Sequence, residues 1–511
     1  MRLTSPALLL VATVGFGCLP EGNCPQIDVP GAHLVERLDG VVSYTRSGTE
    51  LPVFVSSVAD VNGDGVGDLM ISTTGDGSRR AYVVFGGAHL ESAALDQAVA
   101  DAHGFVIEGA PPSAAALGAA APIGDVNGDG LADLALGGSM QPIANPGHGF
   151  IVFGRAAAAP VELATLVENG DGVVISSSDD SPSEVGRVMA RAGDVDGDGI
   201  GDVFVLRSLG ERSPDSVDGE TYVPDAYELW LVPGGGPRTI TLGVDMGPRV
   251  VLRDGGADGK NPLILGTGDL DGDGREDFAV GDPEAADLRG RLYVVSGIVF
   301  DSAGDSVRTP SDAVAAGLAV VLEGAQRDDQ FGSPLVAVGD VNGDGLPDVA
   351  VGANRALSDD RGQVTVVYGG LDIWTVTRDR LEQGIGGVII SGENPNDYLG
   401  YVGGGDMDGD GVQDLLVGSI VAPAGASAAG VAHMLLGSFG WADRSVAPGS
   451  PGLVTIAGPP TCDSVGRSVV ALGDVTDDGY DDFAMVSYSL ALNMLDLADA
   501  HIHIVKGRSS W

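Results

Sequence analysis

Cysteines, basic residues, aromatic side chains and long apolar runs are all scarce in this chain of 511 residues. Three cysteines are too few for a disulfide-rich scaffold or a cysteine metal cluster. After residue 20, no apolar run approaches the roughly 18 residues of a transmembrane helix. The chain has only 27 Lys and Arg residues but 72 Asp and Glu residues, which gives a net charge of −45. Such a charge disfavours nucleic-acid binding and a polybasic membrane patch.

Glycine is abundant instead, with 81 residues, or about 16% against roughly 7% in average proteins. Apolar residues make up 44% of the chain, which excludes an acidic disordered protein. Abundant glycine together with many Val, Leu and Ala residues predicts short strands that are joined by tight turns.

The first 17 residues have the features of a secretory signal peptide: Arg2, an apolar stretch over 7–14, and the small residues Gly15 and Gly17. Two cleavage modes are open. Ordinary signal peptidase can use the two glycines, or the segment 15–18 acts as a lipobox and Cys18 is lipidated. Either mode predicts an exported protein, displayed as an outer-membrane or cell-surface lipoprotein or otherwise secreted. We expect residues 18–39 to be a tether, with Cys24 and Cys462 either bridged or present as free thiols.

A nine-residue acidic pattern occurs seven times, and its copies begin 65 to 75 residues apart. Side-chain oxygens occupy positions 1, 3, 5 and 9 of the pattern, and glycine occupies position 6. Together with position 7, whose backbone carbonyl is a further donor, these positions form the predicted metal sites. The residues are Asp60, Asn62, Asp64, Val66 and Asp68; Asp125, Asn127, Asp129, Leu131 and Asp133; Asp194, Asp196, Asp198, Ile200 and Asp202; Asp269, Asp271, Asp273, Arg275 and Asp277; Asp340, Asn342, Asp344, Leu346 and Asp348; Asp406, Asp408, Asp410, Val412 and Asp414; and Asp474, Thr476, Asp478, Tyr480 and Asp482.

Oxygen donors at this spacing are typical of calcium loops, because Ca²⁺ takes six to eight oxygen ligands. An EF-hand is excluded, since its loop closes with Glu at position 12 on a helix. Acidic turns without a metal are the alternative. That alternative explains neither the fixed acid at position 9 nor the crowding of like charges. The sequence therefore predicts up to seven Ca²⁺ ions, although the seventh loop departs from the pattern at Thr476 and Asp477.

Four apolar, β-rich stretches surround each acidic loop: one well before it, one leading into it, one directly after it and one further on. The first of these is found at 41–44, 105–107, 173–175, 250–252, 320–322, 388–390 and 454–456. The last is found at 81–85, 150–153, 227–230, 292–295, 364–368, 431–435 and 502–505. Seven units of four strands predict an all-β, seven-bladed β-propeller over residues 40–511, with a solenoid as the alternative. The ring is expected to close by the N-terminal strand joining the last blade.

Unit and loop together resemble the FG-GAP repeats of the integrin α-subunit N-terminal propeller and of related exported bacterial proteins. Phe331-Gly332 before the fifth loop and Gly352-Ala353 after it match the family marks best. Elsewhere the marks drift, as in Leu117-Gly118 and Val185-Gly186, and the first and fourth units lack the glycine before the loop. The resemblance implies a calcium-stabilised propeller that is used in adhesion or ligand binding.

Motifs for an enzyme are missing, including a nucleophile elbow, a P-loop and a His-Glu-x-x-His motif. His501 and His503 share a strand face without a third ligand. Two functions remain: a non-enzymatic scaffold that binds an extracellular protein or glycan, and a propeller enzyme that acts on extracellular polysaccharide or lipid. Membrane contact is expected only through a lipid on Cys18. Trp374 and Trp441 either stack on sugars or pack locally.

Overall fold

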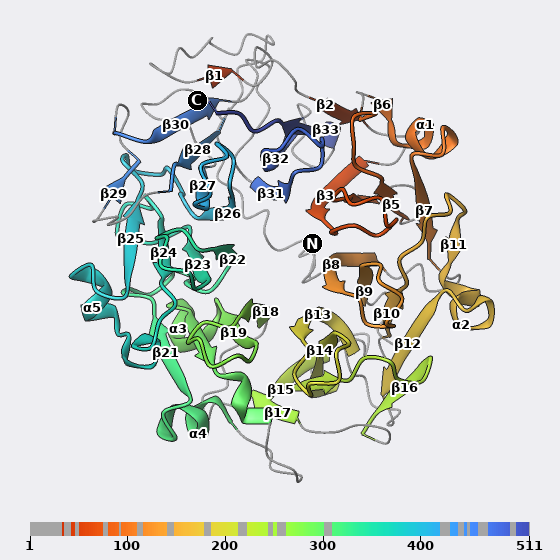
Figure 1. Ribbon diagram of the computed structural model, residues 1–511. Helices are drawn as coiled ribbons and strands as arrows, with labels where there is room; N and C mark the ends of the chain where they lie inside the picture. The colour runs from red at the N-terminus through yellow and green to blue at the C-terminus, as the bar shows by residue number, and fades with distance from the viewer. Residues whose placement is uncertain are drawn as a thin grey trace.

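Seven β-sheets surround a common centre, each with its innermost strand facing that centre (Figure 1). The structure is a computed structural model. It describes residues 33–34, 42–45, 51–74, 80–90, 93–109, 116–139, 148–177, 185–212, 222–243, 249–252, 262–300, 309–419, 430–437, 444–446, 450–457, 469–490 and 497–509. The predicted seven-bladed propeller of four-stranded blades is confirmed. The signal peptide, Cys18, Cys24, Trp441 and Cys462 lie outside the described residues.

Each blade is an antiparallel sheet, and its four main strands follow one another from the centre of the ring to the rim. Blades 1 and 2 contain β3 (Leu51–Ser57), β4 (Leu69–Thr74), β5 (Arg80–Val84) and β7 (Gly104–Glu108), and β8 (Ala116–Gly124), β9 (Asp133–Ser139), β10 (Gly149–Val152) and β12 (Gly172–Ser177). Blades 3 and 4 contain β13 (Val185–Gly193), β14 (Asp202–Arg212), β15 (Tyr222–Val232) and β17 (Arg249–Leu252), and β18 (Leu263–Gly268), β19 (Asp277–Asp282), β20 (Arg291–Val295) and β21 (Ala319–Glu323). Blades 5 and 6 contain β22 (Leu335–Gly339), β23 (Asp348–Ala353), β24 (Gln363–Val367) and β25 (Gly387–Ser391), and β26 (Tyr401–Gly405), β27 (Asp414–Ser419), β28 (Val431–Leu435) and β30 (Leu453–Ala457).

Blade 7 combines strands from opposite ends of the described chain. It contains β31 (Val469–Gly473), β32 (Asp482–Leu490) and β33 (Leu497–Val505), and its fourth main strand is β2 (Val42–Thr45). β2 runs antiparallel to β33, with Val42 opposite Ile504 and Thr45 opposite His501. This arrangement is compatible with the predicted ring closure.

Five blades gain a short fifth strand that runs parallel to the outer strand. β6 (Ala93–Ala94), β11 (Val161–Glu162), β16 (Thr239–Leu242) and β29 (Arg444–Ser445) each lie in the connection between the third and fourth strands of one blade and pair with the preceding blade. β1 (His33–Leu34) pairs in the same way with β30 of blade 6. One described strand, β1, therefore lies inside the segment 18–39 that the sequence predicted to be a tether.

The hydrophobic core is divided among the seven interfaces between neighbouring blades, and each interface has its own buried cluster. The cluster between blades 7 and 1 joins Leu69 and Ile71 to Ala484 and Ile504, all fully buried. Side chains alternate between the two faces of a sheet, and the apolar ones on each face pack against the neighbouring blade. The stability of each blade therefore depends on both of its neighbours. The closure of the ring is therefore as apolar as its other interfaces.

Helices are short and lie in connections between strands, most of them at the rim of the ring (Figure 1). They are α1 (Leu95–Ala100), α2 (Leu166–Asn169), α3 (Ala285–Leu288), α4 (Pro310–Ala315) and α5 (Arg378–Glu382), with 3₁₀ turns η3 (Leu163–Thr165), η4 (Gly297–Phe300) and η5 (Ile373–Thr375). Among the described residues, no helix has the length and apolar character needed to cross a membrane. Since neighbouring strands are antiparallel, all seven acidic loops, which join first to second strands, lie on the same face.

Candidate metal centres

The first carboxylate of each acidic loop folds the loop around itself. We number the loops by blade: loop 1 (60–68), loop 2 (125–133), loop 3 (194–202), loop 4 (269–277), loop 5 (340–348), loop 6 (406–414) and loop 7 (474–482). In loop 1, Asp60 Oδ1 accepts the backbone N–H of Gly63 at 2.6 Å and Oδ2 accepts that of Gly65 at 2.8 Å. Asp340 in loop 5 repeats both bonds with Gly343 and Gly345. Glycine at these two positions has a positive φ, for example +82° at Gly63 and +90° at Gly65.

Positions 3 and 5 extend this turn and bring further oxygens together. Asn62 Oδ1 accepts the N–H of Asp64 at 2.8 Å, and Asp64 Oδ1 accepts that of Val66 at 2.9 Å. In the loops with Asn at position 3, its amide also donates to the carboxylate at position 5, as Asn62 does to Asp64 at 3.0 Å. The loops with Asp at position 3 lack that donor. In each of them three carboxylates come within 4.8 Å of one another: Asp194, Asp196 and Asp202; Asp269, Asp271 and Asp273; and Asp406, Asp408 and Asp414.

The carboxylate at position 9 is fully buried in every loop. Asp68 Oδ2 accepts the N–H of Val61 at 2.9 Å, and its Oδ1 accepts that of Gly86 at 2.8 Å. The same two bonds, from position 2 and from a glycine after the third strand, recur in the other loops. The structure shows that both oxygens already accept backbone hydrogen bonds, so position 9 also joins the loop to the third strand of its blade.

Burial controls the ionisation of these position-9 carboxylates. Removal from water raises the pKa of Asp68, Asp133, Asp277, Asp348 and Asp414 to about 7 and that of Asp482 to about 6, although the backbone hydrogen bonds act in the opposite direction. Burial likewise raises the pKa of Asp202. Neighbouring loop carboxylates add to the increase, so a bound cation would favour the ionised form.

The glycine that bonds to position 9 is a functional position that the sequence reasoning missed. These glycines are Gly86, Gly154, Gly234, Gly297, Gly369, Gly437 and Gly507. A Cβ atom on Gly86 would lie 2.0 Å from the carbonyl oxygen of Gly67, the residue at position 8, and one on Gly297 would lie 2.1 Å from that of Glu276. The detectable signal was a glycine that follows the third strand in all seven units.

Backbone hydrogen bonds also join several pairs of neighbouring loops. The N–H at position 8 of one loop donates to the position-1 carbonyl of the preceding loop: Ala132 to Asp60 at 3.0 Å, Gly201 to Asp125 at 2.9 Å and Asp481 to Asp406 at 3.0 Å. In several of these pairs the side chain at position 7 also packs on the position-4 glycine of the preceding loop, as Leu131 does on Gly63 and Ile200 on Gly128. Tyr480 makes the corresponding contact with Gly409. The described loops therefore form linked pairs rather than isolated turns.

Loop 7 differs in its ligand set and its surroundings. Thr476 at position 3 is buried, and Asp477 has a positive φ of 57°. The Lys506 ammonium lies 3.8 Å from Asp478 Oδ2. Loop 7 thus has one carboxylate fewer than the loops with Asp at position 3, and an ammonium group lies beside its position-5 acid.

Trp374 lies beside Asp271, a predicted metal ligand of loop 4. Its indole N–H donates to Oδ2 of Asp271 at 2.8 Å, across the interface between blades 4 and 5. The histidines singled out earlier lie on β33, where His503 stands opposite Met485 of β32 and His501 opposite Ser487. Both histidines are therefore residues of a paired strand in blade 7.

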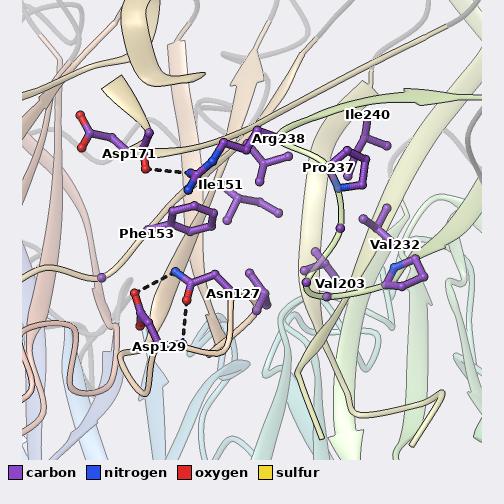
Figure 2. A pocket seen from close by; sticks show the side chains of 18 of the residues that line it. Asn127, Asp129, Ile151, Phe153, Asp171, Val203, Val232, Pro237, Arg238 and Ile240 are labelled. Atoms are coloured by element: carbon purple, nitrogen blue, oxygen red, sulfur yellow. Dashed lines mark hydrogen bonds between the residues drawn. The ribbon is translucent and has the colours of Figure 1, made fainter. Parts of the chain in front are cut away.

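A cavity of about 450 Å³ opens beside loop 2, between blades 2 and 3 (Figure 2). Ile151, Phe153 and Ile240 contribute apolar walls. The Arg238 guanidinium lies 5.0 Å from the centroid of the Phe153 ring and donates to the carbonyl of Gly170 at 2.7 Å. On the opposite side, Asn127 donates to Asp129 (Figure 2). The polar rim of this cavity is therefore held by hydrogen bonds within the protein.

The Phe331-Gly332 mark has a structural basis. Phe331 is buried in the cluster between blades 4 and 5, and Gly332 adopts a φ of +116°. The N–H of Gly332 donates to the carbonyl of Gly352, so the marks before and after loop 5 are bonded to each other. A Cβ atom on Gly352 would lie 2.2 Å from the carbonyl oxygen of Gly400, which explains the requirement for glycine there.

Fold and loops together define a seven-bladed β-propeller with acidic, oxygen-rich loops on one face. Residues 334–367, which span loop 5 and its flanking strands, match the family model of the FG-GAP repeat. The chain thus contains a segment that matches the FG-GAP repeat, and parts of it are similar in sequence to integrin α chains.

Three relatives illustrate the similarity. Integrin alpha-PS2 of Drosophila melanogaster is 31% identical over 242 residues, 46% of this chain and 15% of the relative. Integrin alpha-5 of Xenopus laevis is 30% identical over 157 residues, 30% of this chain and 14% of the relative. Phosphatidylinositol-glycan-specific phospholipase D of Rattus norvegicus is 35% identical over 176 residues, 33% of this chain and 19% of the relative. The matches thus cover less than a fifth of each relative.

Proposed function

We propose that this protein is an exported, calcium-binding propeller that acts as a non-enzymatic scaffold for an extracellular ligand. The observation that carries the proposal is the sevenfold acidic loop, folded in each blade around its first carboxylate and joined to the third strand through its ninth. Similarity to integrin α chains supports a binding role, because those relatives share the FG-GAP architecture.

Calcium is the proposed ion because every side-chain donor at positions 1, 3, 5 and 9 is an oxygen. Hard cations prefer such donors, and a flexible loop suits the larger coordination number of Ca²⁺ better than the strict octahedron of Mg²⁺. The three carboxylates within 4.8 Å in loops 3, 4 and 6 repel one another unless a cation lies between them. Up to seven ions are proposed, with the weakest at loop 7.

Export is proposed on the signal-peptide features of residues 1–17, with anchoring through a lipid on Cys18 or free secretion. The medium outside the cytoplasm supplies calcium at concentrations that suit extracellular modules, whose dissociation constants are often about 10⁻⁴–10⁻³ M. The ligand is proposed to be an extracellular protein or glycan.

A calorimetric titration of metal-free protein with Ca²⁺ tests the metal part of this proposal, and melting curves in calcium and in chelator accompany it. We expect saturable binding and a higher melting temperature in calcium. A titration without heat and an unchanged melting curve would refute calcium binding. Protein and glycan arrays, probed in calcium and in chelator, then test the scaffold role.

An enzymatic role is the second candidate, and the phospholipase D relatives favour it. Those relatives are named for action on phosphatidylinositol-glycans. An enzyme is expected to carry an acidic or basic cluster outside the repeats. The three groups of clustered acids among the described residues all belong to the repeated loops, which favours the scaffold. Release of a phosphatidylinositol-glycan-anchored reporter, above a heat-denatured control, would reverse this preference.

A further inference from the structure

Trp374 connects blade 5 to a metal loop of blade 4. It lies in η5, within the connection that leads from β24 to β25, and packs beside the buried cluster between the two blades. From there its indole N–H donates to Asp271 Oδ2 at 2.8 Å, although the two residues are 103 positions apart in the sequence. Asp271 is position 3 of loop 4.

Both oxygens of the Asp271 carboxylate are held. Oδ2 accepts the indole N–H, and Oδ1 accepts the backbone N–H of Asp273 at 3.1 Å. The backbone of the same blade-5 connection bonds to the loop as well, since the N–H of Gly370 donates to the carbonyl of Leu270 at 2.7 Å. Blade 5 thus fixes loop 4 at its second position through the backbone and at its third through a side chain.

Loop 4 is unusual in this respect. In loops 1, 2, 3, 5 and 6, the position-3 side-chain oxygen accepts the backbone N–H of position 5, as Asp196 does from Asp198 and Asp408 does from Asp410. In loop 4, Asp269, Asp271 and Asp273 lie within 4.8 Å of one another, as the acids of loops 3 and 6 do, and only here does an indole N–H from the next blade also bond to one of them among the described residues. A neutral N–H donor orients a carboxylate without competing with the cation for its charge, in contrast to the Lys506 ammonium beside loop 7.

We propose that Trp374 is the positioning residue of the fourth metal loop: its indole N–H holds Asp271 in the orientation that a divalent cation requires, and it couples occupancy of the loop to the interface between blades 4 and 5. This inference rests on the proposed calcium binding. Outer-shell partners of this kind change metal affinity by about 10- to 100-fold when they are removed. Trp374 therefore acts through Asp271 rather than on the ion.

The first test is a double-mutant cycle with Trp374→Phe and Asp271→Ala, measured as unfolding in saturating calcium and in chelator. Phe keeps most of the packing and removes the N–H. We expect Trp374→Phe to weaken calcium binding at this loop about tenfold, a loss of about 1.4 kcal/mol of calcium-dependent stabilisation. We expect a much smaller effect in chelator and no further calcium-dependent loss in the Asp271→Ala background. Equal losses with and without calcium would assign Trp374 to packing alone and overturn the inference.

The second test uses fluorine NMR of the full chain labelled with fluorotryptophan. The Trp374 resonance is assigned by its loss in Trp374→Phe, and Trp230, which is buried within β15 and bonded to Glu228, is the internal control. We expect calcium to shift the Trp374 resonance and leave that of Trp230 in place. A Trp374 resonance that ignores calcium, in a protein whose melting temperature responds to it, would overturn the inference and leave the proposed calcium binding intact. A melting temperature that also ignores calcium would refute both.

Discussion

Asp68 and Gly86, 18 residues apart, are joined by a 2.8 Å hydrogen bond that ties the end of loop 1 to the end of the third strand of its blade. The other oxygen of Asp68 bonds to Val61 at the start of the loop. One buried carboxylate thus connects three separate backbone segments. This relationship is repeated in all seven blades, and it gives the acid at position 9 a role that does not depend on a metal.

Replacement of a position-9 acid is therefore expected to destabilise the protein even without calcium. Asp348→Ala leaves the buried N–H of Val341 and the partly buried N–H of Gly369 without their acceptor. We expect a loss of about 3 kcal/mol in unfolding free energy in chelator, against less than about 1 kcal/mol for the exposed Asp344→Ala. Urea unfolding in chelator measures both. Equal losses would contradict the separate roles of the two positions.

Glycine after the third strand is required by space rather than by backbone conformation. In Gly86→Ala the new Cβ would meet the carbonyl oxygen of Gly67 at 2.0 Å, so the strand end must move. Gly65→Ala is the matched control, because its φ is +90° but nothing lies within 4 Å of the added atom. We expect a cost of at least about 3 kcal/mol for the first variant and about 1 kcal/mol for the second. Thermal unfolding would contradict this reading if the two variants melted together.

Ala59 is the residue before loop 1 and has a φ of +56°, a conformation that glycine adopts before five of the other six loops. These glycines are Gly124, Gly193, Gly268, Gly339 and Gly473. Ala59→Gly is expected to stabilise the protein by about 0.5–1 kcal/mol, because the strain of a left-handed alanine exceeds the entropic cost of glycine. Ala98→Gly, inside α1, is the control and is expected to destabilise by about 1 kcal/mol. A lower melting temperature for Ala59→Gly would contradict the strain at this position.

The pH dependence of stability is expected to differ between metal-free and calcium-loaded protein. Burial raises the pKa of Asp68, Asp133, Asp277, Asp348 and Asp414 to about 7 from an ordinary value of 3.8. A raised folded-state pKa means that the folded protein binds more protons, so its stabilising contribution is complete below pH 3.8 and is lost as the pH rises through 7. Metal-free protein is therefore expected to lose stability between about pH 4 and pH 7.

Calcium favours the ionised carboxylates and is expected to remove or reverse this loss. Melting temperatures across the range, in calcium and after removal of metal, check the prediction. A metal-free protein that becomes more stable toward pH 7 would show that the position-9 acids ionise normally in the fold.

The repeated part of the architecture could be predicted from the sequence, and the contacts between repeats could not. Six copies of Asp-x-Asn/Asp-x-Asp-Gly and a seventh with Thr at position 3, each with flanking β-rich stretches, were enough to predict blade number, strand number and loop positions. The fifth strands were missed because pairs such as Ala93-Ala94 and Arg444-Ser445 carry no alternation. The contact between Trp374 and Asp271 was also missed, since no local pattern links residues 103 positions apart. The two-residue strand His33–Leu34 was missed for the same reason, because it is too short to show an alternating pattern.

The pairing of Val42 with Ile504 has a consequence for how the molecule is made. This sheet joins β2 to β31, β32 and β33, so it cannot be completed until β33 has been synthesised. Non-local pairing of this kind slows folding. A product truncated before β33 would leave the early β2 strand without its neighbour and expose unsatisfied edges on either side of the gap, which are templates for aggregation. We therefore expect ribosomal stalling or proteolysis before β33 to destabilise the fold more than cleavage in an inter-strand turn elsewhere in the ring.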